Sequence, residues 1–205
     1  HRADLTALGI REIPIDLNNG SFDTFISELA PDIVLFDRFM MEEQFGWRVE
    51  KHCPEAVRVL ETSDLQSLRD ARQQRLKNRL KASEDGNDFS ELFAPALREE
   101  FVLMAETDLA QREIAAIYRC DLSLMISEVE IELLVEHFKL PRSLLHGCPL
   151  MVDLPTHAPV PFEDRAHFIH IGNFRHAPNW DAVLWLKTTI WPMIRQQLPA
   201  AQLHI

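Results

Sequence analysis

Acidic, basic and hydroxyl side chains stand where the apolar runs of the N-terminal part of the chain end. Asp37 and Arg38 follow one such run, Glu61 and Asp64 follow the next, and Ser127 ends a third. A carboxylate at a strand end can act as a general acid or base, or orient a hydroxyl group of a bound ligand. The more common roles are structural, because Asp favours helix caps and turns. All five residues are therefore candidates for a binding site, with caps and turns as the alternative.

Ser127 has a local explanation of its own. The sequence "SEVE", Ser127 to Glu130, has the S-x-x-E form of a capping box at a helix N-terminus. A role of Ser127 in ligand binding would be additional to that cap.

A second group of polar residues lies in the loop "GNFRHAPN". It contains a glycine that lets backbone approach a ligand, a guanidinium group, two side-chain amides and a following helix N-terminus, which suits an anion and in particular a diphosphate. The residues are Gly172, Asn173, Arg175 and Asn179, the last also expected to cap the helix. The loop matches neither G-x-G-x-x-G nor a P-loop, so a dinucleotide or a triphosphate is not indicated. A plain connection in an α/β sheet is the alternative.

A basic segment runs from Arg69 to Lys81 in an otherwise acidic chain. Its six basic residues are Arg69, Arg72, Arg75, Lys77, Arg79 and Lys81, against the single acidic Asp70. The segment could contact anionic lipid headgroups or an anionic acceptor. A solvated helix face is favoured, because Gln73, Gln74 and Asn78 leave no strong apolar stripe.

Metal sites and nucleophile motifs find no support in the sequence. His167 and His170 are three apart in a predicted strand and would point to opposite faces. His146 and Cys148 could share a face, but two ligands are too few for zinc. No G-x-S-x-G motif occurs. We expect no metal and no cofactor.

Composition narrows the class of protein. The formal net charge of -11 over 205 residues argues against nucleic acid as the main partner. No apolar run approaches the roughly 18 residues that span a bilayer. The three cysteines are far apart, which favours a reducing, cytoplasmic compartment. Because the sequence lacks an initiator Met and stops in the strand-like "AQLHI", we expect a piece of a longer protein, which a targeting signal could precede.

Strand and helix patterns alternate along the chain. The predicted strands are Arg11–Ile15, Asp32–Asp37, Ala56–Thr62 and Asp121–Ser127, and the second has the apolar character of a buried strand. The predicted helices are Ser21–Ala30 capped by Ser21, Met41–His52, Asp64–Lys81, Pro95–Tyr118 after the polar segment 83–90, and one from Ser127 to about Phe138. This alternation predicts an α/β fold: a parallel Rossmann-like sheet with helices on both faces.

The chain changes character near Pro141. We predict a partial N-terminal domain over residues 1–140, a Pro-rich linker over 141–166, and the start of a second Rossmann-like domain, its first β-α-β unit, over 167–205. Pro192 should kink or restart the helix of that unit.

Three segments resemble the group-1, retaining glycosyltransferases of the GT-B type. "RVLETSDLQSLRDAR" (Arg58–Arg72) is similar to the family's D-T-x-D-L-H-x-L-R segment, and "CDLSLMISEVEIELL" (Cys120–Leu134) to a strand and helix with S-x-x-E. Residues Ile171 to Ile205 resemble the entry to the family's second domain: Gly after a strand, a helix with an internal Pro, then LP-x-a-x-L-x-I.

The resemblance implies a transferase that moves a sugar from a nucleotide-diphosphate sugar to a glycan, lipid or protein acceptor. The donor would lie on the second domain and the acceptor on the first, in a cytoplasmic enzyme that could sit peripherally at the inner face of the membrane. The family's E-x7-E motif would follow Ile205 and its first strand would precede His1, so we expect this segment by itself to be inactive. Asn173 stands where many members have Arg, which Arg175 could replace, and Gln66 stands where they have His.

Two other functions stay open at this point. "APDIVLFD" also resembles the phospho-acceptor strand of a receiver module, which would make Asp37 a phosphorylation site, although the pattern lacks the usual Pro and Gly turn. The third alternative is a sugar-binding relative that kept the fold without turnover.

Overall fold

The computed structural model describes residues 4–82, 101–102, 104–152, 156–175 and 177–205. These form two compact units that divide between Met151 and Val152. The polar segment 83–90, and the part of the helix expected over 95–118 that precedes Phe101, lie outside the described residues.

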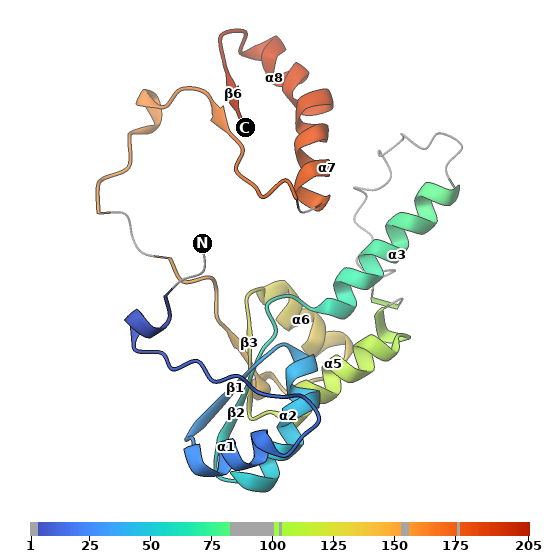
Figure 1. Ribbon diagram of the computed structural model, residues 1–205. Coiled ribbons are helices and arrows are strands. Elements are labelled where there is room, and N and C mark those ends of the chain that lie inside the picture. Colours follow the sequence, from blue (N-terminus) through green and yellow to red (C-terminus); the bar gives the residue numbers. More distant parts are fainter. Residues whose placement is uncertain (1–3, 83–100, 103, 153–155, 176) are drawn as a thin grey trace. The chain divides into compact units, whose positions relative to one another are not determined.

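Unit 1 is built on a four-stranded parallel sheet (Figure 1). Its strands are β1 (Ile33–Asp37), β2 (Val57–Glu61), β3 (Leu122–Met125) and β4 (Leu145–Gly147), in the order β1-β2-β3-β4. Leu35 lies opposite Val59, and Leu60 lies opposite Ser123. The predicted parallel α/β sheet is therefore confirmed. Its last strand comes from the segment that we predicted as a linker.

The helices of unit 1 follow the expected order with shifted ends. They are η1 (Thr6–Leu8), α1 (Ser21–Leu29), α2 (Phe39–His52), α3 (Gln66–Ala82), α5 (Asp108–Arg119), α6 (Glu128–His137) and η3 (Arg142–Leu144). The predicted Ser127 cap is confirmed, since its Oγ accepts a hydrogen bond from the Glu130 N–H (3.4 Å). Helix α2 ends two residues before Pro54, which cannot continue a helix.

Two local predictions at the N-terminus are wrong. Residues 11–15 form no strand; they are exposed, and Pro14 removes one of the donors that a sheet would need. Ser21 is the first residue of α1, not its cap. The cap position is Gly20, which has no side chain to accept a hydrogen bond, and the Ser21 N–H donates to Asn19 Oδ1 at 2.9 Å.

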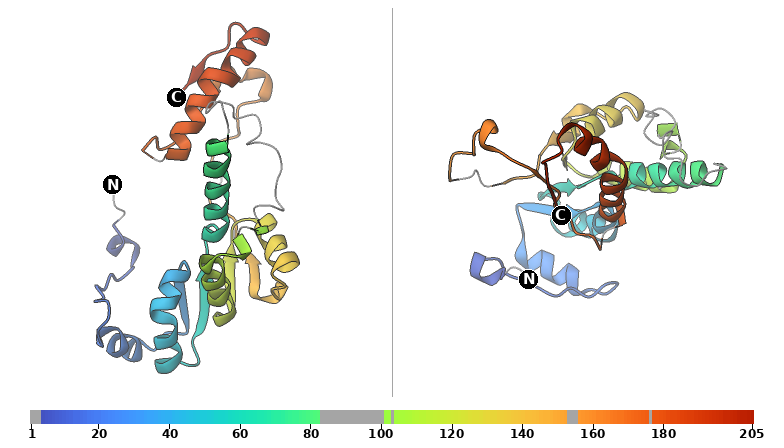
Figure 2. Two further views of the ribbon diagram at one scale, coloured as in Figure 1. Left: turned by 90° about the vertical axis from the view of Figure 1, so that its right-hand side faces the viewer. Right: turned by 90° about the horizontal axis from the view of Figure 1, so that it is seen from above.

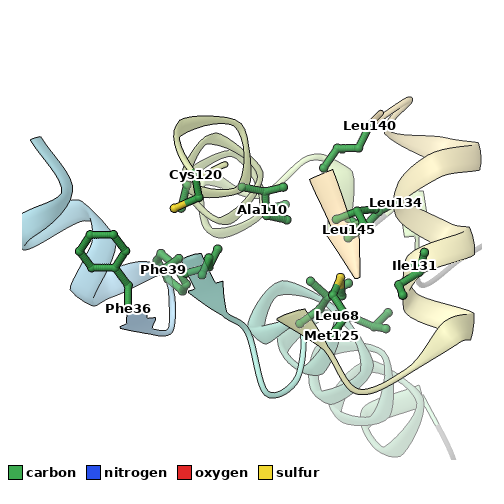
Figure 3. Packing of buried hydrophobic residues seen from close by; sticks show 14 of the residues in the cluster. Phe36, Phe39, Leu68, Ala110, Cys120, Met125, Ile131, Leu134, Leu140 and Leu145 are labelled. Carbon is green, nitrogen blue, oxygen red and sulfur yellow. The ribbon is translucent and has the colours of Figure 1, made fainter. Parts of the chain in front are cut away.

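One face of the sheet forms the hydrophobic core. Side chains alternate across a strand, and those on this face are buried: Phe36, Leu60, Ser123, Met125 and Leu145. Helices α2, α5 and α6 cover them with Phe39, Ala110, Ile131 and Leu134, among others (Figure 3). The core of unit 1 is therefore a sheet packed against one layer of helices.

Much of the other face of the sheet is exposed within the described residues, although Val59 on this face is buried. Ile33, Leu35 and Val57 are 64%, 57% and 44% exposed. The prediction of helices on both faces is thus correct for one face only, and β1 is an exposed edge strand, not a buried one. The reason is handedness: four parallel strands in consecutive order, joined by right-handed crossovers, place every crossover helix on the same side.

Unit 2 is a β-α-β unit, as predicted. Strands β5 (Phe168–Ile169) and β6 (Leu203–His204) pair in parallel, and between them lie α7 (Ala177–Trp185), the π-helical η5 (Leu186–Ile190) and α8 (Trp191–Gln197); η4 (Phe162–Asp164) precedes β5. Pro192 is the second residue of α8, so the predicted restart is confirmed. Asn179 lies within the first turn of α7 and is not its cap.

Two features expected from composition can be compared with the described residues. None of the helices there is long and apolar enough to cross a bilayer. Cys53, Cys120 and Cys148 are free thiols, and burial raises the pKa of Cys120 to about 12. Cys120 is therefore protonated and unreactive at neutral pH.

Candidate functional site

The carboxyl ends of β1 and β2 bring two predicted site residues together. Asp37 lies opposite Glu61 in the sheet, and by alternation both side chains stand on the open face. The backbone that follows each carboxylate is in the left-handed region: φ is 70° at Arg38 and 55° at Ser63. For residues other than glycine such a conformation costs about 1–3 kcal/mol, and strained residues of this kind cluster at active sites and ligand clamps.

Arg38 ties the two strand ends together. Its backbone N–H donates to the Glu61 carbonyl oxygen at 2.8 Å. Its Nε donates to Asp37 Oδ1 at 3.0 Å, and this hydrogen bond raises the pKa of the arginine. Its Nη2 also donates to Asp37 Oδ2, at 3.4 Å, but Asp37 is 67% exposed, so a ligand hydroxyl can still reach the carboxylate.

Glu61 is oriented by the loop that follows it. Its Oε1 accepts the Ser63 N–H at 2.7 Å, and the Ser63 hydroxyl is 3.0 Å from both carboxylate oxygens. A carboxylate held in this way has a fixed direction and can position a hydroxyl group at the sheet edge. Sequence reasoning considered Ser63 only as a helix cap and missed its contact with Glu61, whose signal would have been a small polar residue two positions after a strand-end acid.

Asp64 and Ser127 lie at the same edge of the sheet but have structural partners. Asp64 Oδ2 accepts from Arg69 Nη1 at 3.2 Å, and Ser127 Oγ is engaged at the start of α6. A cap of α3 by Asp64 or Ser63, the structural alternative that the sequence offered, is not seen: the N–H groups of Gln66 and Ser67 at the start of α3 donate to a carboxylate of another helix.

That carboxylate is Glu113 of α5. Glu113 accepts the Gln66 N–H (2.8 Å), the Ser67 N–H (3.1 Å) and the Ser67 hydroxyl. Burial raises the pKa of Glu113, and it also raises the pKa of Glu130 on α6.

The buried Glu113 had a signal in the sequence that we did not use. It lies three residues after Ala110 and four before Ile117, in the apolar stripe of an amphipathic helix. A charged residue in such a stripe must find hydrogen-bond donors when it is buried. Here they are backbone groups of another helix, which local pattern cannot identify.

In the loop between β5 and α7 of unit 2, two side-chain amides form hydrogen bonds to the backbone of the loop. Asn173 Oδ1 accepts the Arg175 N–H at 3.1 Å, and Asn179 Nδ2 donates to the Asn173 carbonyl at 3.2 Å. Gly172 packs against Asn179, since a Cβ at Gly172 would be 3.4 Å from Asn179 Nδ2. The two amides thus hold the loop, while the Arg175 side chain is exposed beside the start of α7 and can meet an anion.

The basic segment belongs to α3, whose C-terminal half extends away from the sheet (Figures 1 and 2). Arg75 is buried and Arg69 is paired with Asp64, whereas Arg72, Lys77 and Lys81 are exposed. Only part of the charge of this segment is therefore presented at its surface.

A metal-binding cluster is not found among the described residues, where no three His, Cys, Asp or Glu side chains lie close enough to share an ion. Phosphorylation of Asp37 in a receiver-like module stays a prediction. No protein-family model, no curated protein and no solved structure matches this chain.

Proposed function

We propose that this chain is part of a glycosyltransferase that moves a sugar from a nucleotide-diphosphate sugar to a glycan, lipid or protein acceptor. The observation that carries the proposal is the pair Asp37 and Glu61, side by side at the carboxyl edge of a parallel sheet. Ligands of open α/β sheets bind at this edge. Oriented carboxylates there suit the hydroxyl groups of an acceptor, and the sequence resemblance assigns the acceptor to this unit.

Unit 2 supplies the donor side of the proposal. A sugar diphosphate would lie at the loop between β5 and α7, with Arg175 and the N-terminus of α7 facing the phosphates. In transfer the leaving diphosphate gains negative charge, and these groups would stabilise it more in the transition state than in the ground state. The exposed cations of α3 add a peripheral contact with an anionic membrane at the cytoplasmic face.

Replacing Arg175 tests the donor side. We expect Arg175→Ala to weaken binding of UDP or GDP by at least tenfold, because a charge-assisted hydrogen bond contributes roughly 1.5–3 kcal/mol. Isothermal titration calorimetry with each nucleoside diphosphate measures the change. Arg165→Ala is the matched control, since Arg165 is an exposed arginine of the same unit whose Nε donates to the Val160 carbonyl. Equal loss in both variants, or no loss in either, would contradict the assignment of Arg175.

A further inference from the structure

The segment that leads into α1 contains the exposed dipeptide Asn19-Gly20. Asparagine followed by glycine is prone to a spontaneous reaction, in which the backbone nitrogen of the glycine attacks the side-chain amide carbon of the asparagine. Glycine favours the attack because it has no Cβ to hinder the approach of the two groups. The sequence therefore makes Asn19 a candidate for chemical modification.

The surroundings of Gly20 leave its nitrogen free to react. A Cβ added at Gly20 would meet no atom within 4 Å, so no neighbouring group restricts its movement. Its carbonyl accepts the Thr24 N–H at 3.3 Å, but its own N–H has no acceptor among the described residues. Attack on Asn19 therefore breaks no hydrogen bond of the Gly20 nitrogen in this part of the chain.

The side-chain amide of Asn19 folds back onto its own backbone in an Asx turn. Its Oδ1 accepts the Ser21 N–H at 2.9 Å and the Ser21 hydroxyl at 2.5 Å. Its Nδ2 donates to Asp16 Oδ2 at 3.2 Å. Hydrogen bonds to a carbonyl oxygen stabilise the negative charge that develops on that oxygen during nucleophilic attack. The two Ser21 donors thus favour addition of the Gly20 nitrogen at Asn19 Cγ.

The main-chain carbonyl of Asn19 has a charged donor. Arg48 Nη2 donates to it at 2.5 Å, while Arg48 Nε donates to Asp23 Oδ1 at 2.5 Å. Arg48 is buried, so its guanidinium group is held in place. Because charged donors form stronger hydrogen bonds than neutral ones, the main-chain carbonyl is the more strongly polarised of the two carbonyl groups of Asn19.

We propose that Asn19 forms a succinimide spontaneously and that Arg48 directs the product to isoaspartate. First, the Gly20 nitrogen bonds to Asn19 Cγ, the Cγ–Nδ2 bond breaks, and ammonia leaves with the proton of the Gly20 nitrogen. Water then adds to one carbonyl of the ring and cleaves its bond to that nitrogen, which regains a proton. Addition at the main-chain carbonyl gives isoaspartate, whose new carboxylate lies beside Arg48.

Peptide mapping of the intact chain, incubated at neutral pH and physiological temperature, measures the first step. Asn173 is the internal control, because its Oδ1 accepts the Arg175 N–H in the same kind of turn but Phe174 follows it. We expect Asn19 to convert at least tenfold faster than Asn173. Gly20→Ala should slow conversion of Asn19 at least tenfold with an unchanged circular dichroism spectrum, since Gly20 has an ordinary φ of -78° and open surroundings. Equal rates at the two asparagines, or an unchanged rate in Gly20→Ala, overturn the proposal.

The ratio of isoaspartate to aspartate measures the second step. Electron-transfer dissociation distinguishes the two products at position 19. A synthetic peptide of residues 14–25 has the same local sequence but lacks Arg48. We expect the ratio to be at least twofold higher in the folded chain than in the peptide, because only the folded chain polarises the main-chain carbonyl. A ratio no higher than that of the peptide overturns the role of Arg48.

Discussion

Leu60→Ala is expected to destabilise unit 1 by about 3–5 kcal/mol. Leu60 has no exposed surface, and it lies in β2 on the covered face of the sheet, between Phe36 of β1 and Ser123 of β3. Truncating a fully buried leucine removes its transfer free energy and leaves a cavity, together worth roughly 2–5 kcal/mol. The centre of a small sheet with helices on one side has little freedom to collapse, so we expect the upper part of that range. The urea midpoint, with an unchanged m-value, measures the loss.

Leu35→Ala is the matched control for this prediction. The substitution is chemically identical and lies in the neighbouring strand, but on the open face, where Leu35 is 57% exposed. We expect a change within about 0.5 kcal/mol, as for surface substitutions in general. A loss at Leu35 as large as that at Leu60 would show that the second face of the sheet is covered in solution, and would contradict the one-sided core.

Glu113→Ala is expected to cost about 2–4 kcal/mol. The carboxylate accepts the backbone N–H groups of Gln66 and Ser67 and the Ser67 hydroxyl, in a buried position where each donor left unpaired costs roughly 1–3 kcal/mol. The start of α3 depends on these bonds, because they satisfy N–H groups that have no acceptor within the helix. Glu132→Ala, an exposed glutamate on α6, is the control and should change the urea midpoint little.

The pH dependence of the free energy of unfolding shows whether the effect of Glu113 depends on its ionisable carboxyl group. Burial raises the pKa of Glu113 above its ordinary value of 4.5. Between the two values the folded protein holds a proton that the unfolded chain has released, so stability rises as the pH falls through this window. Glu113→Gln cannot titrate. The stability of the native protein relative to Glu113→Gln should therefore increase on acidification from neutral pH toward pH 4.5, and a difference independent of pH would contradict the burial of the carboxyl group.

Several strands, helices and helix ends of this protein could be predicted from short stretches of sequence, because the interactions that form them lie within those stretches. Alternation of apolar runs with amphipathic segments predicted the parallel sheet of unit 1 and the β-α-β order of unit 2, since each strand and helix carries its own periodicity. Ser127 was found as a cap and Pro192 as a helix restart for the same reason, because both effects act within one turn of the chain. The strand-end position of Asp37 and Glu61 follows from the strand boundaries alone.

Other features depended on contacts between segments far apart in sequence. The partner of Glu113 is a helix start 46 and 47 residues earlier, and no pattern within α5 specifies it. Strand order places the apolar β1 at the edge of the sheet. The handedness of the crossovers places the helices between the strands on one side of the sheet, so side chains of β1 on the other side are exposed. The residues alone thus predicted β1, β2 and β3 and the groups that end them, but not β4 or the absence of a strand at 11–15. The tertiary structure decided which face of the sheet is buried and which strand lies at its edge, because burial depends on the segments that pack nearby.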